Sequence, residues 1–228
     1  MSKEKRAKWH PFKYFAYDFT IITGSPAFLW YRPKRIYISK KAKKKRPKGG
    51  MILISNHITM LDPIYLAVGY PWRRHHWVAT KELFCSPARK WFFGKVFHNI
   101  EIDRDNFSIA SFKEIVWYLK DGRMVTIFPE GHVNTNKDGT MNAFKSGMVM
   151  MAVKAKVPIV PVFLKKKEHW YSRLVIAIGE PIHIEDFTNS PVPTMEDINK
   201  ISTALEEQTK ELERLCHKER TKKHETSK

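Results

Sequence analysis

The sequence predicts an α/β fold with a largely parallel central sheet flanked by helices, an N-terminal aromatic helical segment and a C-terminal helix. Short apolar runs typical of buried strands alternate with helical patterns along most of the chain, which indicates a parallel sheet. The first thirty residues are unusually aromatic, and apolar residues near the C-terminus recur at helical spacing. The 228 residues suffice for one domain with a substantial core.

The N-terminal stretch 12–31 is aromatic and is flanked by basic residues on both sides. It contains Lys13 and Asp18 and is interrupted by Gly24-Ser25-Pro26, so it lacks the roughly 20 uninterrupted apolar residues of a spanning helix. Aromatic rings close to cations favour the headgroup layer of a bilayer. The pattern predicts a helical hairpin lying at a membrane surface; a helix that covers one edge of the domain is the alternative.

A strongly basic run follows at 40–48, and it predicts a solvated loop between two strands because it cannot pack into a core. The whole chain carries 41 Lys+Arg against 23 Asp+Glu, a formal net charge of +18 that requires an anionic partner. The sequence contains none of the familiar recognition elements of nucleic-acid-binding proteins. An anionic membrane surface is therefore favoured, and no nucleic-acid partner is expected.

Six strands and four further helices are predicted after the basic run. The first strand is a continuous apolar run after Gly49-Gly50, as in strands buried on both faces. The predicted strands lie at 51–54, 77–79, 100–102, 124–128, 159–163 and 174–178. The helices between them are predicted at 63–68, 87–96, 107–119 and 143–156.

The C-terminal helix is predicted to begin at a capping box formed by Thr194 and Asp197 and to end near His217, with a frayed tail. We divide the chain into an N-terminal interfacial segment (1–35), an α/β domain (36–190) and a C-terminal helix with a basic tail (191–228). Cys85 and Cys216 lie far apart, so neither a disulfide framework nor a metal site is expected. A reducing, cytoplasmic setting fits this cysteine usage.

The residues with the clearest chemical potential follow the first buried strand. His57 and Asp62 form an HxxxxD spacing at the carboxyl end of that strand, where open α/β sheets bind ligands. Asp62-Pro63 is typical of a helix N-cap followed by proline at the first helical position. A turn that folds back would let Asp62 orient the imidazole and leave its other nitrogen free as a general base. A histidine that merely caps the strand end is the alternative.

A second HxxxxD match, from His98 to Asp103, predicts no such pair. These two residues flank an extended stretch, in which an odd separation places side chains on opposite faces. Five steps of about 3.3 Å also hold them far apart.

Around His57 the sequence resembles the glycerolipid acyltransferase family that contains the 1-acyl-sn-glycerol-3-phosphate acyltransferases. Several short blocks match that family in the expected order, over roughly residues 50 to 165. They are Asn56–Pro63, Ala79–Phe84, Ile100–Arg104, Phe128–Gly131 and Val157–Val162, the last preceded by Lys145-Ser146-Gly147.

The resemblance implies an O-acyltransferase that moves a fatty acyl group from acyl-CoA or acyl carrier protein to the sn-2 hydroxyl of a lysophospholipid acceptor, 1-acylglycerol 3-phosphate. His57 would be the base and Asp62 its orienting partner. Arg104, Glu130 and Gly131 match family positions that bind the glycerol phosphate. A guanidinium suits a phosphate, although Arg104 could instead pair with a neighbouring aspartate.

Two further residues in this predicted acceptor site keep alternatives open. Glu130 would repel a phosphate, so it is expected to orient Arg104 or a glycerol hydroxyl, or to form a buried salt bridge. Lys81 would add positive charge, or it is simply solvated.

The chain departs from the family pattern in the third block. Many members continue it as Glu-Gly-Thr-Arg, whereas Glu130-Gly131 is followed here by His132 and Val133. The missing arginine leaves open another acceptor, such as glycerol 3-phosphate or a different lysophospholipid. A non-catalytic basic lipid-binding protein is the alternative from another class. The resemblance implies no cofactor or metal, and we expect a peripheral protein of phospholipid synthesis at the cytoplasmic face of the cell membrane.

Overall fold

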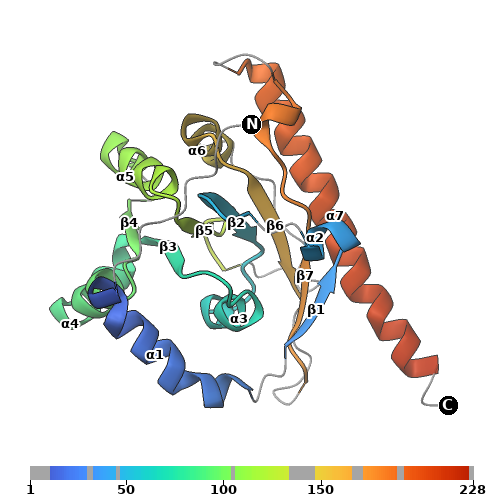
Figure 1. The fold of residues 1–228 in the computed structure, drawn as a ribbon, viewed down its shortest axis with the longest axis horizontal. Helices are drawn as coiled ribbons and strands as arrows, with labels where there is room; N and C mark the ends of the chain where they lie inside the picture. Colours follow the sequence, from blue (N-terminus) through green and yellow to red (C-terminus); the bar gives the residue numbers. More distant parts are fainter. Residues whose placement is uncertain are drawn as a thin grey trace.

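The computed structural model describes residues 11–29, 33–44, 47–103, 106–133, 147–165, 172–188 and 193–225. Within these ranges, strands form one seven-stranded sheet in the order β1-β7-β6-β2-β5-β3-β4 (Figure 1). Every neighbouring pair is parallel except β6 with β7. The predicted, largely parallel α/β fold is therefore confirmed. The strands are β1 (Lys34–Tyr37), β2 (Met51–Ser55), β3 (His75–Thr80), β4 (Ile100–Ile102), β5 (Met124–Ile127), β6 (Ile159–Leu164) and β7 (Val175–Ile178).

Helices cover both faces of the sheet (Figure 1). On one face Ile52 and Ile54 of β2 join a core cluster with apolar residues of three helices, α5 (Ile109–Lys120), α6 (Gly147–Ala155) and α7 (Met195–Glu225). On the other face Met51 and Leu53 pack with α3 (Asp62–Gly69). Because successive residues of a strand point to opposite faces, a central strand with two covered faces must be apolar throughout. This explains the continuous run at 51–54.

The N-terminal segment forms one helix, α1 (Pro11–Leu29), so the predicted hairpin is wrong. A proline within a helix removes one backbone hydrogen bond, and the bonds on either side keep the helix continuous through Gly24-Ser25-Pro26. The inner face of α1 is docked on the domain: the backbone N–H of His75 donates to the Tyr17 hydroxyl (3.1 Å), and Asp18 pairs with Arg74 (2.6 Å). None of the helices in the described ranges is both long and apolar enough to cross a bilayer.

The basic run lies between two strands as predicted, but its first part is a short helix, α2 (Lys40–Lys44), rather than a loop. Ala42 is buried, and its N–H donates to the Ser39 hydroxyl at 3.1 Å. The small side chain in the middle of the lysines thus gives the run one apolar side on which to pack. The lysines of α2 remain exposed, and Lys41 reaches Glu180 at 3.3 Å.

The C-terminal helix starts as predicted. The N–H of Asp197 donates to the Thr194 hydroxyl (3.2 Å), and the N–H of Thr194 donates to the Asp197 carboxylate (2.9 Å), which confirms the capping box. The helix continues to Glu225, beyond the predicted end near His217. In Figure 1, α7 runs along the side of the sheet formed by β6 and β7.

Strand β1 (Lys34–Tyr37) was not predicted, and the six predicted strands lie close to their predicted positions. The predicted helix at 87–96 is a short α-helix, α4 (Pro87–Arg89), followed by a π-helical turn, η2 (Lys90–Val96). Two 3-10 turns, η1 (Lys81–Phe84) and η3 (Ile184–Asp186), were not predicted. The first part of the helix predicted at 143–156 lies outside the described residues.

The close packing of β2 against α5 yields a testable prediction about stability. A Cβ atom at Gly50 would lie 2.0 Å from the backbone carbonyl oxygen of Leu119, and backbone cannot move as a flexible side chain can. Gly50→Ala should therefore lower the free energy of unfolding by about 1–3 kcal/mol in urea denaturation. Gly147→Ala is the matched control, because open space surrounds that position and alanine favours a helix. Equal stability of the two variants would contradict the packing described here.

Candidate active site

The predicted functional residues gather at one edge of the sheet. His57 follows β2, Glu130 follows β5, and Lys81 and Asp103 follow β3 and β4. These four strands are consecutive in the sheet, in the order β2-β5-β3-β4, and run parallel, so their carboxyl ends lie along the same edge. Open α/β sheets bind ligands at this edge. Arg104 follows Asp103 directly but lies outside the described residues.

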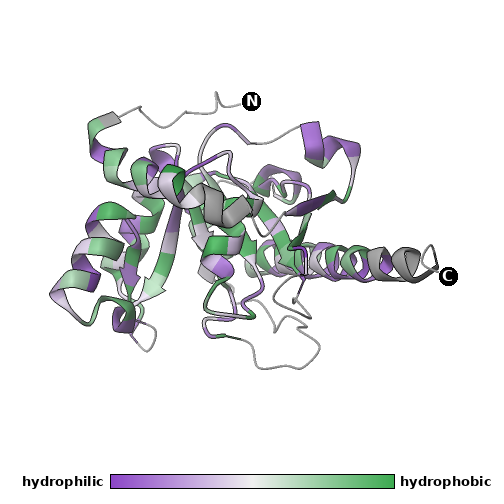
Figure 2. Cartoon of the chain, turned by 90° about the horizontal axis from the view of Figure 1, so that it is seen from below, coloured by the Kyte–Doolittle hydropathy of each residue, from purple (hydrophilic) through white to green (hydrophobic). Residues whose placement is uncertain are grey.

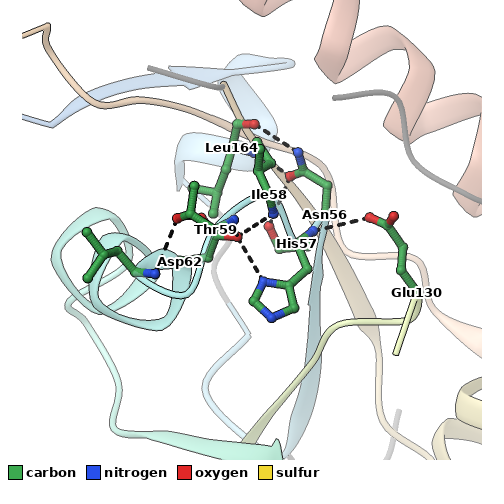
Figure 3. Close-up of polar contacts among 9 residues, drawn as sticks. Asn56, His57, Ile58, Thr59, Asp62, Glu130 and Leu164 are labelled. Carbon is green, nitrogen blue, oxygen red and sulfur yellow. Dashed lines mark hydrogen bonds and ion pairs between the residues drawn. The ribbon is translucent and has the colours of Figure 1, made fainter. Parts of the chain in front are cut away.

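His57 and Asp62 are in direct contact. The Nδ1 atom of His57 lies 2.9 Å from Oδ2 of Asp62 (Figure 3). A carboxylate only accepts hydrogen bonds, so Nδ1 carries the hydrogen and the lone pair resides on Nε2. In Figure 3 that second nitrogen points away from the carboxylate. This arrangement leaves Nε2 able to accept a proton while the carboxylate orients the ring.

The Asp62 carboxylate also holds the loop between β2 and α3. It accepts hydrogen bonds from the N–H groups of Ile58 and Thr59 and, at 2.9 Å, from the Thr59 hydroxyl. The expectation that Asp62 is the N-cap was wrong, because Leu61 takes that position and Asp62 is the first helical residue. Its side chain turns back towards the strand and accepts hydrogen bonds from the loop. The same carboxylate thus binds both the backbone of the loop and the His57 ring. Asp62 is only 1% exposed.

Asn56 is a structural residue of the site that the sequence analysis did not single out. Its side-chain amide donates to the backbone carbonyl of Leu164 (2.9 Å) and accepts from the N–H of the same residue (2.7 Å). The side chain thus links the loop after β2 to the end of β6. The side-chain amide of a fully buried asparagine must form hydrogen bonds within the protein. A polar Asn56 directly after a buried apolar strand was therefore the signal that could have predicted this structural role.

The segment after β5 supports His57 from a second side. Gly131 has φ of 73° and donates its N–H to the Phe128 carbonyl (3.0 Å), which closes a tight turn that favours glycine at this position. The backbone N–H of Gly131, a residue expected at the glycerol phosphate, is therefore hydrogen-bonded within the protein. The turn directs Glu130 inward, where it is 4% exposed and accepts a hydrogen bond from the backbone N–H of His57 (3.2 Å). The Phe128 ring stacks on the imidazole.

Lys81 and Asp103 pair with each other at 2.8 Å, so strands β3 and β4 are joined at the edge where the site lies. The Lys81 side chain is 52% exposed. His98, the histidine of the second HxxxxD match, contacts the Lys13 carbonyl instead (3.2 Å). The prediction that His98 and Asp103 form no pair is therefore confirmed.

Comparison with known proteins identifies the family. The family model described as Acyltransferase matches residues 35–165, more than half of the chain and the whole of this edge of the sheet. The chain belongs to the acyltransferase family. This acyltransferase is 33% identical over 171 residues to the 1-acyl-sn-glycerol-3-phosphate acyltransferase of Bacillus subtilis, a match covering 72% of the chain and 81% of the relative.

Two further comparisons agree. The acyltransferase is 30% identical over 170 residues to the 1-acyl-sn-glycerol-3-phosphate acyltransferase of Streptococcus pneumoniae, covering 70% of the chain and 62% of that relative. A crystal structure of the 1-acyl-sn-glycerophosphate (LPA) acyltransferase PlsC from Thermotoga maritima superposes with a TM-score of 0.60 at 22% identity, covering 86% of this chain and 78% of that one. This likeness shows that the fold is shared. The chain covers less than two thirds of the length of some relatives, including 56% of the mouse alpha enzyme.

The geometry of Asp62 predicts the effect of removing its charge. In Asp62→Asn, the amide oxygen can still accept from Ile58, Thr59 and His57, while its NH₂ group can face the Thr59 hydroxyl, which also accepts. The fold should therefore persist, but the imidazolium formed in the reaction loses its negative partner. We expect kcat for acyl transfer to fall by about 10²–10⁴-fold.

Asp186→Asn is the matched control, because Asp186 is an exposed carboxylate on η3. Circular dichroism should show the same folded state for both variants. An Asp62→Asn variant with the turnover of the control would refute the orienting role of the carboxylate.

Proposed function

We propose that this acyltransferase moves a fatty acyl group from an acyl thioester, acyl-CoA or acyl carrier protein, to the sn-2 hydroxyl of 1-acylglycerol 3-phosphate. The product would be phosphatidic acid, an intermediate of phospholipid synthesis. The observation that carries the proposal is the contact of 2.9 Å between His57 and Asp62 at the ligand-binding edge of the sheet. The printed names of the bacterial relatives support the choice of acceptor.

The proposed reaction needs only proton transfer and acyl exchange. Nε2 of His57 takes the proton of the acceptor hydroxyl as the oxygen attacks the thioester carbonyl carbon. The new C–O bond forms, the C–S bond breaks, and the imidazolium returns the proton to the departing thiolate. Asp62 stabilises the positive imidazolium between these steps. No metal or redox cofactor enters this scheme.

We assign the acceptor's phosphate to the neighbouring loops after β3 and β4. Arg104 directly follows this edge, and Lys81 is largely exposed there. A guanidinium can bind a phosphate through two parallel hydrogen bonds, while an ammonium contributes a point charge. Glu130 also supports the His57 backbone, because its buried carboxylate accepts a hydrogen bond from that N–H. Gly131 contributes the turn that places it.

A different acceptor is the second candidate within the same chemistry. Val133 stands where many family members have an arginine, and it is a partly buried apolar residue close to Gly131. Because this departure removes one positive charge from the acceptor region, glycerol 3-phosphate and other lysophospholipids belong in the same assay.

We place the protein peripherally at the cytoplasmic face of the cell membrane, with α1 as a contact surface. Viewed from the side on which α1 lies, hydrophobic residues recur along this helix (Figure 2). Four of them form an exposed face opposite the buried Tyr14 and Tyr17; they are Phe12, Phe15, Phe19 and Ile22, exposed by 95%, 67%, 57% and 69%. Together with the net charge of +18, this face suits an anionic membrane surface.

Acyl transfer from labelled acyl-CoA and acyl carrier protein to 1-acylglycerol 3-phosphate tests the proposal. In detergent–lipid micelles, His57→Ala should lose at least about a hundredfold in kcat because the base is gone. His183→Ala is the control and should retain activity. His183 is exposed and follows Ile182, which bridges to Ile159 at the start of β6, at the opposite edge of the sheet. If the parent protein uses neither donor with this acceptor, the acceptor assignment is wrong. Vesicle binding without turnover on any acceptor would favour the non-catalytic alternative.

The membrane-contact surface has its own test. A Phe12→Ser, Phe15→Ser, Phe19→Ser variant removes exposed rings that the fold does not bury, so folding should be unaffected. Each ring transferred from water into lipid contributes about 1–3 kcal/mol, so sedimentation with anionic vesicles should weaken at least tenfold. Met195→Ser, which changes an exposed apolar residue on α7, should bind like the parent. Unchanged sedimentation of the triple variant would eliminate α1 as the contact.

A further inference from the structure

We propose that Phe128 and Trp77 are positioning residues, whose stacked rings set the plane of the His57 imidazole and hence the direction of its Nε2 atom. This inference rests on the proposed function, because one of its readouts is acyl transfer. Neither residue needs to touch the substrate. Their effect on the reaction passes through the base.

Four aromatic rings lie in a continuous stack that ends at His57. The imidazole and the Phe128 ring have centroids 4.2 Å apart and planes inclined by 18°. Phe128 and Trp77 follow at 6.0 Å and 9°, and Trp77 and His75 at 4.6 Å and 7°. The two separations that involve Trp77 fall in the usual range of stacked aromatic pairs, and the contact between His57 and Phe128 is slightly closer. The rings come from three separate segments: the loop after β2, the turn after β5, and β3 itself.

The register of the sheet explains why the rings align. Trp77 pairs with Thr126 and Leu53 pairs with the same Thr126 from the other side. Because side chains alternate along strands, His75 and Trp77 share a face with Thr126, and Phe128 continues this face two residues on. Trp77 and Phe128 accordingly pack in the core cluster on the α3 side of the sheet. The stack is therefore a product of strand pairing.

The hydrogen bond to Asp62 alone does not determine the direction of the Nε2 lone pair of His57. It fixes the position of Nδ1, but the ring can still tilt about the Nδ1···Oδ2 direction. A flat neighbour at 4.2 Å removes this freedom, so the hydrogen bond and the stack together define where the Nε2 lone pair points. The Phe128 face would also favour the imidazolium that forms as the acceptor proton is taken, as aromatic faces favour other cations.

The far end of the stack is anchored. His75 is 1% exposed, and both of its ring nitrogens are hydrogen-bonded: Nε2 to the Tyr70 carbonyl (3.0 Å) and Nδ1 to the Thr126 hydroxyl (3.0 Å). Burial lowers the pKa of His75 to about 4, so this ring is neutral near pH 7. Trp77 therefore rests on a fixed, uncharged partner, and it cannot easily slide away from Phe128.

Replacing the aromatic ring of Phe128 by an aliphatic side chain, which cannot stack on the imidazole, tests the proposal. Phe128→Leu should lower kcat for acyl transfer about tenfold or more, while KM for the acceptor stays within about threefold, because misorientation of a reacting group affects the chemical step. Phe128→Tyr keeps the aromatic face and should restore most of kcat. Phe112→Leu is the matched control: this ring is also partly buried, but it packs on the opposite face of the sheet.

A second readout does not require turnover. In histidine-labelled protein, the ring protons of His57, identified by their absence in His57→Ala, should be shifted upfield by the ring current of Phe128. Phe128→Leu should abolish this shift and Phe128→Tyr should keep it. A Trp77→Phe variant, which shortens the stack but retains a ring, should show an intermediate effect on both readouts.

The two readouts separate the failure of this inference from the failure of the proposed function. A parent protein that shows the upfield shift but transfers nothing to 1-acylglycerol 3-phosphate would refute the acceptor and support the stacking of His57 on Phe128. Absence of the shift in the parent, or a Phe128→Leu variant with the kcat of Phe112→Leu, would overturn the positioning role.

Discussion

The buried carboxylate of Asp62 is the constraint on which the rest of the site depends. A charge that is 1% exposed is tolerated only when hydrogen bonds replace the water it has lost. Here two backbone N–H groups, one hydroxyl and the His57 imidazole supply them. Satisfying the carboxylate therefore holds the chain after β2 in a tight loop, and this loop places the imidazole of His57. The orientation of His57 and the stability of the loop share one physical origin.

The parallel sheet brings the other parts of the site to this loop. Neighbouring parallel strands end at one edge, so segments far apart in the sequence meet there without any long connection having to cross the sheet. Asn56 joins the loop to the end of β6, and Glu130 holds the His57 backbone from the turn after β5. His57, the proposed base, is thus held through its ring, its backbone and the residue before it. Three-sided support of this kind keeps a reacting group in a defined position without substrate present.

Helix α1 connects the proposed membrane surface to the same core. Its outer face carries exposed phenylalanines, while its inner face reaches β3 through Tyr17 and the pair of Asp18 with Arg74. His75, whose N–H binds Tyr17, is also the first ring of the stack that ends at His57. The surface that would lie on lipid is therefore attached to β3, the strand that carries two rings of the stack beside His57.

The sequence alone predicted most of the elements and pointed to the proposed chemistry, because both depend on local patterns. Apolar runs identified the six strands that it assigned, Thr194 and Asp197 identified the start of α7, and the HxxxxD spacing after a buried strand identified His57 and Asp62. Tertiary structure alone decided the single helix α1, the packed Ala42 within the basic run, and the backward turn of the Asp62 side chain. It also decided the partners of Asn56 and Glu130 and the stacking of Phe128 on His57. The physical reason is that the partners of Asn56, Glu130 and Phe128 lie on segments from different strands, and the pairing register that brings them together is a property of the whole sheet. The features of α1, Ala42 and Asp62 are local, but each depends on what the segment packs against or must satisfy in the folded chain.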